Sequence, residues 1–383
     1  MNYQHFDIEV SQNSYKNNDV CGDMFHYEIT EKFTTLILCD GKGHGITGNI
    51  SAQMVLSIVK NLLSSGFSIR NAMEVLLDFY ANTGVDGSHY SAITIARIFP
   101  DGMVNILSYS NPNPIFLSPN NVLVLAGRPI DTGSGIISES NCFIKNGEGI
   151  LLMTDGVTNA GIGRTNQWGW DCEKVCNFIS ANISNGKIDY SQITKDINNE
   201  VFAINSDNFD DDVTSVISFS RVGSVVNILS GPPTDINNDY VFVKKFMSLK
   251  GRKVVCGGTT SNIVSKITKR QITVDTSYYN AFTPPPFIIQ GIDLATEGAI
   301  TLNRLYNIID EPRELMNDTS PVTKLYDELM NADKIIFFIG NSNNATENSI
   351  DFIEQGIRPR NQIIPLIINE LKLKEKLIVV EKI

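Results

Sequence analysis

The stretch Leu36-Ile37-Leu38-Cys39-Asp40-Gly41-Lys42-Gly43-His44-Gly45 joins an apolar run to an acidic residue and a glycine-rich loop. Apolar runs of this kind are typical of strands buried in a sheet interior. The pattern recurs at Ile150-Leu151-Leu152-Met153-Thr154-Asp155-Gly156, and another strand pattern follows Asp210-Asp211-Asp212. A carboxylate at the end of a buried strand is costly unless a cation or a hydrogen-bond donor meets it. These acids therefore indicate a site.

Short strand patterns dominate residues 1–221, and helical patterns come there in two separate pairs. We expect strands at 4–10, 22–29, 33–39, 91–99, 103–109, 113–118, 121–126, 136–144, 149–154 and 213–220, and helices at 46–63, 68–80, 171–183 and 190–204. Short turns between successive strands favour antiparallel pairing. Segregated strands and helices indicate an α+β sandwich rather than a doubly wound parallel sheet.

The pattern changes near residue 223, so the chain of 383 residues is predicted to form two domains, 1–222 and 223–383. Residues 225–229 form a strand pattern that could belong to either side. Beyond them, strand and helix patterns alternate, which predicts a small three-layer α/β domain. Its helices are expected at 240–249, 260–266, 294–308, 320–331 and 361–374, and its strands at 253–256, 272–274, 335–339 and 377–381.

The net charge of −11 argues against nonspecific nucleic-acid binding, which needs a basic surface. The first residues contain neither a basic segment nor an apolar stretch, and no later apolar run approaches the roughly 20 residues of a membrane span. We therefore expect a cytoplasmic protein without a membrane or nucleic-acid partner.

The isolated acids suit hard divalent cations. Oxygen ligands gathered from separate strand ends favour Mg²⁺ or Mn²⁺ over zinc, which prefers Cys and His. Gly41, Gly43 and Gly45 permit a tight loop whose carbonyls can turn toward a cation. Two such ions can clamp a phosphate ester and activate a water molecule.

These motifs together resemble a known family. In chain order they are Gly22-Asp23, Asp40-Gly41-Lys42-Gly43-His44-Gly45, Ser91-Ala92-Ile93-Thr94, Thr154-Asp155-Gly156-Val157-Thr158-Asn159-Ala160 and Asp211-Asp212-Val213-Thr214. Over about residues 1–221 they resemble the stage II sporulation protein E group of the protein phosphatase 2C superfamily. The resemblance implies a four-layer α/β/β/α sandwich of two antiparallel sheets, with a two-metal site at one end.

The resemblance also implies hydrolysis of phosphoserine or phosphothreonine in proteins, with two Mn²⁺ or Mg²⁺ ions. On this chain Asp40 would bridge the ions, Asp155 and Asp211 would complete one site, and the Gly41 carbonyl would join the other. Asp23 would hold metal-bound waters. A bridging hydroxide would attack phosphorus directly, without a covalent phosphoenzyme.

Several assignments remain open in the sequence. Asp212 is the alternative to Asp211, because the two lie in one acidic run. His44 could protonate the leaving oxygen, although a loop histidine more often packs or caps. Lys16 could contact the substrate phosphate, and a solvated surface lysine is an equal alternative. The helices after Asp40 couple directly to its loop, and in the resembling family this region is implicated in regulation and subunit pairing, which makes a homodimer a hypothesis.

In the second half, Gly257, Gly258, Thr259 and Thr260 follow a strand and open a helix, an arrangement that attracts anions. Asp275 ends the next short strand, roughly where a ribose-binding acid lies in a nucleotide fold. A capped helix after a tight turn is the simpler interpretation. A small anionic ligand for this domain is therefore a hypothesis.

The sequence favours a metal-dependent protein serine/threonine phosphatase acting on an unidentified phosphoprotein. A noncatalytic ligand-sensing regulator on a phosphatase-like scaffold is one alternative, against which the complete acid set argues. A small-molecule phosphomonoesterase is another, since it would use the same metals.

Overall fold

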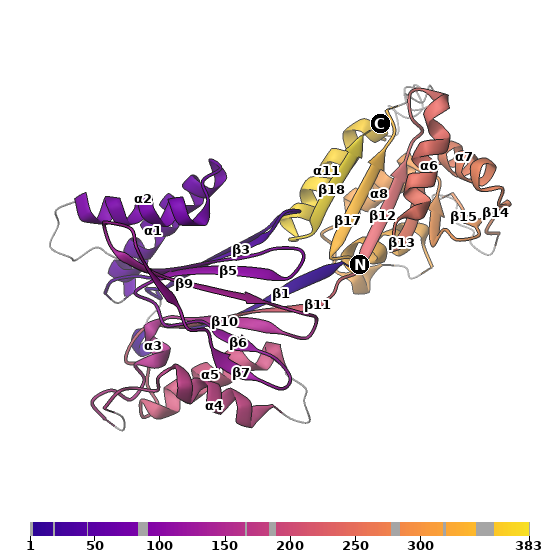
Figure 1. Cartoon of the computed structure of the whole chain (residues 1–383). Coiled ribbons are helices and arrows are strands. Elements are labelled where there is room, and N and C mark those ends of the chain that lie inside the picture. Colours follow the sequence, from indigo (N-terminus) through magenta and orange to yellow (C-terminus); the bar gives the residue numbers. More distant parts are fainter. Residues whose placement is uncertain are drawn as a thin grey trace. The chain divides into compact units, whose positions relative to one another are not determined.

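The structure is a computed structural model that describes residues 3–17, 20–43, 45–82, 91–164, 167–183, 189–276, 284–316, 319–341 and 356–382. The chain forms two compact units, drawn in Figure 1. The first unit is Gln4–Val222, and the second is Gly223–Ile383 together with Met1–Tyr3.

The first unit contains two sheets in which all pairings are antiparallel. The larger has the order β2 (Met24–Ile29), β3 (Thr34–Asp40), β4 (Ala92–Ile98), β5 (Met103–Tyr109), β9 (Ile136–Phe143) and β8 (Arg128–Asp131). The smaller has the order β1 (Gln4–Asn13), β11 (Val213–Val222), β10 (Gly149–Met153), β6 (Ile115–Leu117) and β7 (Val122–Val124).

Helices cover the outer face of each sheet (Figure 1). The helices α1 (Gly45–Ser64) and α2 (Ile69–Asn82) pack on the larger sheet, and α4 (Cys172–Asn182) and α5 (Tyr190–Ile204) pack on the smaller. A third apolar layer fills the space between the sheets. The predicted four-layer α/β/β/α sandwich is confirmed.

The quoted strand shows why these layers form. Ile37 and Cys39 pack among the residues of α1 and α2, whereas Leu36 and Leu38 pack between the two sheets. Successive side chains of a strand point to opposite faces, so a strand that is apolar throughout is buried on both. Strand β3 thus requires cover on two sides, which the second sheet and the helices supply.

The second unit is built on one mixed sheet. Its order is β14 (Ile272–Val274), β15 (Phe287–Ile289), β16 (Leu294–Thr296), β13 (Arg252–Cys256), β12 (Val225–Ser230), β17 (Lys334–Ile339) and β18 (Leu377–Lys382). The five strands from β16 to β18 are parallel, and β15 is antiparallel to both of its neighbours.

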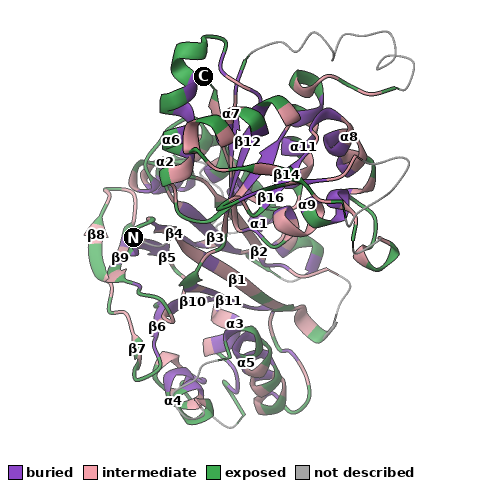
Figure 2. Cartoon of the chain, turned by 90° about the vertical axis from the view of Figure 1, so that its right-hand side faces the viewer, coloured by how far each residue is buried: buried purple, intermediate pink, exposed green. Residues whose placement is uncertain are grey.

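Helices cover both faces of this sheet, and the buried residues lie along the strands and on the inner sides of the helices (Figure 2). One face carries α6 (Asp239–Ser248) and α7 (Gly258–Thr268). The other carries α8 (Ala299–Ile308), α9 (Pro321–Met330) and α11 (Arg360–Leu373). The predicted α/β architecture of this half is confirmed.

Two local predictions change with the structure. The open strand pattern at 225–229 is β12, the middle one of the five parallel strands of the second sheet. The helix expected from residue 294 is wrong at its start, because Leu294–Thr296 is the strand β16 beside β13. Gly298, at φ 134°, separates β16 from α8. Short apolar runs do not by themselves distinguish a buried strand from a helix end.

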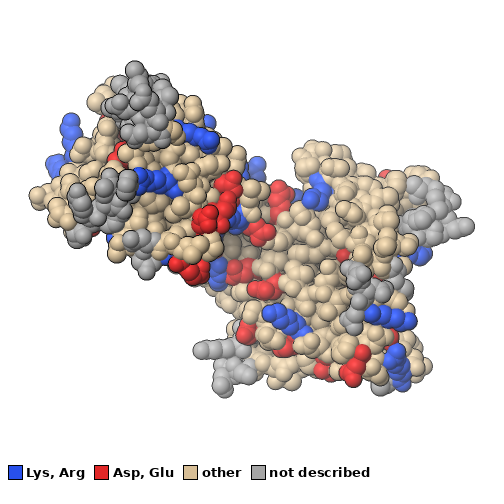
Figure 3. Space-filling model, turned by 180° about the vertical axis from the view of Figure 1, so that it is seen from behind, with Lys and Arg blue, Asp and Glu red and all other residues tan. Residues whose placement is uncertain are grey.

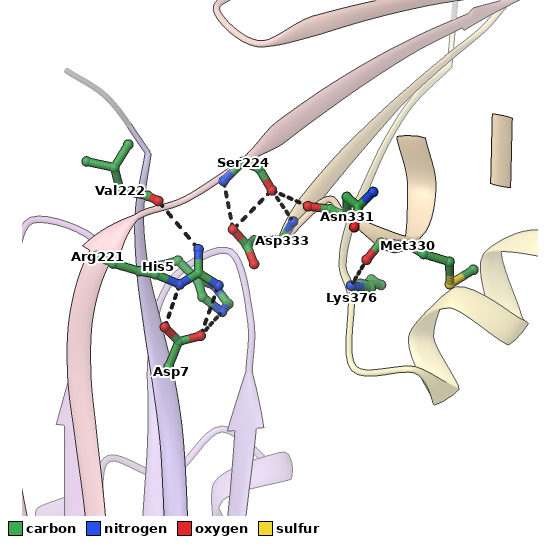
Figure 4. Close-up of polar contacts among 9 residues, drawn as sticks. All are labelled: His5, Asp7, Arg221, Val222, Ser224, Met330, Asn331, Asp333 and Lys376. Carbon is green, nitrogen blue, oxygen red and sulfur yellow. Dashed lines mark hydrogen bonds and ion pairs between the residues drawn. The ribbon is translucent and has the colours of Figure 1, made fainter. Parts of the chain in front are cut away.

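The backbone that connects the two units is held at each end by polar contacts within one unit, as Figure 4 shows. In the first unit the Arg221 side chain forms an ion pair with Asp7, whose other neighbour is His5. In the second unit the Ser224 amide donates to Asp333 Oδ2 at 2.7 Å, and the Ser224 hydroxyl donates to the Asn331 carbonyl at 2.6 Å. Val222 and Ser224 are therefore both held close to their own sheets.

Basic and acidic side chains are interspersed over the described residues on the face shown in Figure 3. Within the described ranges, none of the helices has the length and apolar character of a membrane span.

Candidate metal centre

Four predicted acids lie at one end of the first unit. Asp40 ends β3, and Asp23 precedes β2, whose first residue Met24 pairs with Cys39. Asp155 follows β10 and opens the short helix α3 (Asp155–Thr158), and Asp211 precedes β11, the neighbour of β10. Antiparallel pairing brings the end of one strand beside the start of the next. The two sheets therefore direct these acids to a common edge.

The charges of these acids act on one another. Burial raises the pKa of Asp40, and the charges of Asp23 and Asp155 raise it further. The charge of Asp211 acts in the same direction. Like charges this close are repulsive and favour the protonated acid, unless cations or donors compensate them.

Asp23 is held by hydroxyl groups from the other sheet. Its Oδ2 accepts hydrogen bonds from Thr154 Oγ1 at 2.9 Å and from Thr214 Oγ1 at 2.7 Å. Gln12 Nε2 donates to Thr214 Oγ1 at 3.0 Å and so extends this network. Burial raises the pKa of Asp23, and the two hydroxyl contacts partly oppose that shift. The side chain is therefore fixed before any ligand binds.

The neighbours Asp211 and Asp212 differ in burial, and Asp211 is the more exposed of the two. Asp212 is buried, and its Oδ1 accepts from the Tyr15 amide at 2.9 Å. A Cβ at Gly22 would lie 2.5 Å from Asp212 Oδ2, so this carboxylate faces the loop before β2. The charge of Asp211 raises the pKa of Asp40, and the charges of both Asp212 and Asp211 raise the pKa of Asp23. Both acids therefore lie near the predicted site, and Asp211 rather than Asp212 as the ligand stays a prediction.

The glycine loop after Asp40 packs against backbone. A Cβ at Gly41 would lie 1.9 Å from the Gly48 carbonyl oxygen and 2.6 Å from that of Gly22. A Cβ at Gly48 would in turn lie 2.4 Å from the Gly43 oxygen. The loop therefore has room only for glycine at these contacts, and it ties Asp40 to the first turns of α1. His44 lies outside the described residues.

Lys16 is exposed to solvent. It adopts a left-handed backbone conformation with φ 49°, and its amide donates to the Phe209 carbonyl at 2.9 Å. Its Nζ lies 4.8 Å from the centre of the Tyr15 ring. Interaction with Tyr15, and to a smaller extent the charge of Asp210, raises the pKa of Lys16. The structure thus brings Lys16 beside the acidic run that contains Asp211.

Sequence reasoning missed the side chains that orient the acids. Thr154 and Thr214 hold Asp23, and Asn159 Nδ2 donates to Asp155 Oδ2 at 3.1 Å. All three stand inside the motifs quoted above, next to or near an assigned acid. Their spacing carried no signal of which acid they contact, since Thr214 and Asp23 are 191 positions apart.

The donor set fits a hard cation. It consists of carboxylates with a nearby backbone loop, and Asp212 Oδ2 is a buried carboxylate oxygen without a hydrogen-bond partner among the described residues. The acidic side chains lie close together, but they do not form a complete ligand shell. Within the described ranges, no group of three or more His, Cys, Asp or Glu has the geometry to hold an ion as it stands.

The residues predicted for the second unit divide into two places. Gly257 to Thr260 lie between the end of β13 and the first turn of α7. Asp275 follows the edge strand β14, and β15 and β16 lie between β14 and β13. The structure therefore does not bring Asp275 next to the Gly257 loop within the sheet.

Comparison with known proteins identifies the first unit. Residues 30–219 match the family model described as stage II sporulation protein E (SpoIIE). No curated protein matches the sequence.

Similar solved structures have low sequence identity. The RsbU and RsbW domains of a Mycobacterium tuberculosis protein are 16% identical, with a TM-score of 0.48, over 64% of this chain and 69% of that chain. The PP2C phosphatase domain of SpoIIE from Bacillus subtilis, with a fragment of its regulatory domain, is 16% identical, with a TM-score of 0.49, over 57% of this chain and 64% of that chain. RsbX in complex with magnesium is 17% identical, with a TM-score of 0.40, over 56% of this chain and 96% of that chain. On the match of the family model, the first unit of this chain contains a domain of the SpoIIE family of PP2C-type phosphatases.

Proposed function

We propose that the first unit is a metal-dependent phosphatase that hydrolyses phosphoserine or phosphothreonine in a protein. One observation carries this proposal: four acids from separate strand ends lie close together. The negative charges of Asp23, Asp155 and Asp211 all raise the pKa of Asp40. A protein that only needed to be stable would not gather partly buried acids in this way.

Asp40, Asp155, Asp211 and the Gly41 carbonyl would hold two Mn²⁺ or Mg²⁺ ions, with Asp23 beside them. Ions of this kind, when bound, neutralise the charge of a phosphate ester and lower the pKa of a bound water molecule. The protein residues supply orientation. The hydrogen bond from the Asn159 amide fixes the orientation of the Asp155 carboxylate. The Thr154 and Thr214 hydroxyls hold Asp23 in position to accept a proton or a hydrogen bond from water.

The substrate class is the finer part of the proposal. Lys16 is exposed beside the acidic run, and its contact with the phosphate of a protein substrate is part of this proposal. The alternatives are a small-molecule phosphomonoesterase and a noncatalytic ligand-sensing regulator. The regulator would not need the hydroxyl network around Asp23, so that network argues against it.

The experiment is a phosphate-release assay on the full chain with Mn²⁺, Mg²⁺ or EDTA. The substrates are a phosphoserine peptide, a phosphothreonine peptide and an aryl phosphate. We expect metal-stimulated release that EDTA abolishes, with higher kcat/KM on the peptides. Activity on the aryl phosphate alone would favour the small-molecule esterase, and no release from any substrate with either metal would contradict the proposal.

Thr214→Val is expected to lower kcat by about 10- to 100-fold, the usual effect of removing a residue that orients a metal-site ligand. The change removes a hydroxyl that donates to Asp23 Oδ2 and keeps the size of the side chain. Thr214→Ser retains the hydroxyl and is the matched control, expected to stay near wild type. Equal loss in both variants would show that packing at this buried position matters, rather than the hydrogen bond.

We also propose that the first unit pairs with a second copy of itself through α1. Ile46, Ile50 and Met54 lie at four-residue spacing and are 67%, 64% and 39% exposed, which forms one apolar stripe. Like stripes on two copies can cover each other about a twofold axis. The stripe begins directly after the glycine loop that carries Asp40.

Ile50→Glu is expected to convert a dimer to a monomer, measured by sedimentation velocity over a range of protein concentrations. A charge at the centre of an apolar contact is left without a partner when the contact forms. The control is Ile236→Glu, which changes a comparably exposed isoleucine of the second unit. A wild-type chain that stays monomeric at all concentrations would contradict the pairing.

A further inference from the structure

The second unit has the strand order of a ligand-binding sheet. From β12 the chain first builds β13 and β16 on one side and then β17 and β18 on the other, with all five strands parallel. Helices α6 and α7 follow on one face, and α11 lies on the opposite face. At such a reversal the loops leave the strand ends toward opposite faces, and ligands bind there. The reversal lies between β12 and β17.

The loops that follow β12 and β17 pack closely against each other at glycine residues, and the side chain of Arg360 packs against both loops. A Cβ at Gly340 would lie 2.1 Å from the Pro232 carbonyl oxygen. A Cβ at Gly231, which has φ 79°, would lie 1.5 Å from Arg360 Nη1, so the guanidinium rests on the Gly231 α-carbon. Arg360 Nη2 also donates to the Gly340 carbonyl at 3.1 Å. The first residue of α11 thus places a positive charge at the reversal.

The start of α7 meets the same loop. The Gly231 amide donates to Thr260 Oγ1 at 3.1 Å, which joins the loop after β12 to the first turn of α7. Gly257, at φ 125°, makes the turn into this helix of 11 residues. The amides of Thr259 and Thr260 belong to a first helical turn, where no intrahelical acceptor is available. They contribute a partial positive charge beside the loop, and Thr259 is exposed to solvent.

A buried hydroxyl without a partner provides an independent sign of a ligand. Ser230 is the last residue of β12 and is only 1% exposed, and its Oγ has no hydrogen-bond partner among the described residues. Val226 and Ile228, four and two positions earlier, pack with α8, α9 and α11. Because side chains alternate along a strand, Ser230 points to the same face. Its hydroxyl is therefore directed toward the side of the sheet on which Arg360 begins α11.

We propose that the second unit binds the phosphate group of a small phosphorylated molecule at this reversal. The switch-point cluster consists of Ser230, Gly231, Thr259, Thr260 and Arg360. It combines a guanidinium, first-turn amides of a helix and hydroxyl groups, which are the donors that recognise phosphate. Free phosphate, a nucleotide or a phosphorylated sugar would present the same group.

The test is calorimetric titration of the full chain in EDTA, so that divalent cations at the first unit do not contribute. Inorganic phosphate, AMP, ATP and glucose 6-phosphate are the probes. We expect saturable binding of at least one of them, and Arg360→Gln is expected to weaken it by about 10-fold or more because a charge-assisted contact is lost. Arg358→Gln, a change of an exposed arginine two positions earlier, is the matched control and is expected to bind as wild type.

A second variant does not depend on Arg360. Thr259→Pro removes one first-turn amide at a helix position that tolerates proline, and it is expected to weaken the same probe. Binding of phosphate alone would identify the group itself as the ligand, and binding of AMP or ATP alone would identify a nucleotide; both support the site. The proposal is overturned if no probe binds the wild-type chain, or if both variants bind with wild-type affinity. Neither result bears on the phosphatase assay, which concerns the first unit.

Discussion

Asp40→Asn is expected to reduce Mn²⁺-stimulated phosphate release by at least about 100-fold, since the loss of a ligand exceeds the 10- to 100-fold effect of losing a residue that only orients one. Asp40 is the acid whose pKa responds to Asp23, Asp155 and Asp211 together, which makes it the centre of the group. Asparagine keeps the shape of the side chain and removes its charge. The measurement is kcat/KM on the phosphoserine peptide at saturating Mn²⁺.

The same variant separates a lost site from a lost fold. Burial and neighbouring negative charges raise the pKa of Asp40, so the ionised side chain is unfavourable in the folded protein. In EDTA near neutral pH, Asp40→Asn is therefore expected to melt at or above the wild-type temperature. Asp101→Asn, at an exposed turn between β4 and β5, is the matched control. Wild-type activity in Asp40→Asn would remove the metal hypothesis.

Gly41→Ala is expected to destabilise the chain by about 1–3 kcal/mol or more and to abolish metal-stimulated activity. The added methyl group would meet the Gly48 carbonyl at 1.9 Å and the Gly22 carbonyl at 2.6 Å. Both obstacles are backbone, so relief requires the loop to move away from α1 or from the segment before β2. Either movement displaces Asp40. Urea denaturation and the peptide assay measure the two effects.

The control for Gly41→Ala is Gly66→Ala in the turn between α1 and α2. Gly66 has φ 92°, and no atom lies within 4 Å of an added Cβ. This variant therefore measures the cost of an unfavourable backbone conformation without a steric clash. It is expected to keep its activity. If Gly41→Ala matched it in both stability and activity, the close packing of the loop would not be needed for function.

Much of the fold was predictable because its signals are local. The apolar run at 36–39 and the turn residues between later strands mark antiparallel strands, and the paired helical patterns mark the outer layers. The predictions failed where short segments are ambiguous. Leu294–Thr296 has only three residues, and its strand conformation depends on pairing with β13, which lies far from it in the sequence.

The acids of the candidate site could be named from the chain, because a carboxylate that ends or precedes a buried strand conflicts with its apolar surroundings. The residues that orient them could not. Thr214 contacts Asp23 only because the two sheets are stacked, and the Tyr15 amide donates to Asp212, 197 positions later in the sequence. The distances between these residues along the sequence do not indicate either contact.

The local chemistry of the chain was sufficient for the strand and helix types, the α+β and α/β classes of the two halves, and the acids at strand ends. Periodicity and turn residues act over a few positions, so they can be read without the fold. Only the folded chain shows that the charge of Asp211 acts on Asp40, that β12 is the middle one of five parallel strands in the second sheet, and that Arg360 rests on Gly231. These facts depend on pairing and packing between segments far apart in sequence, and such contacts are decided by burial of the whole chain at once.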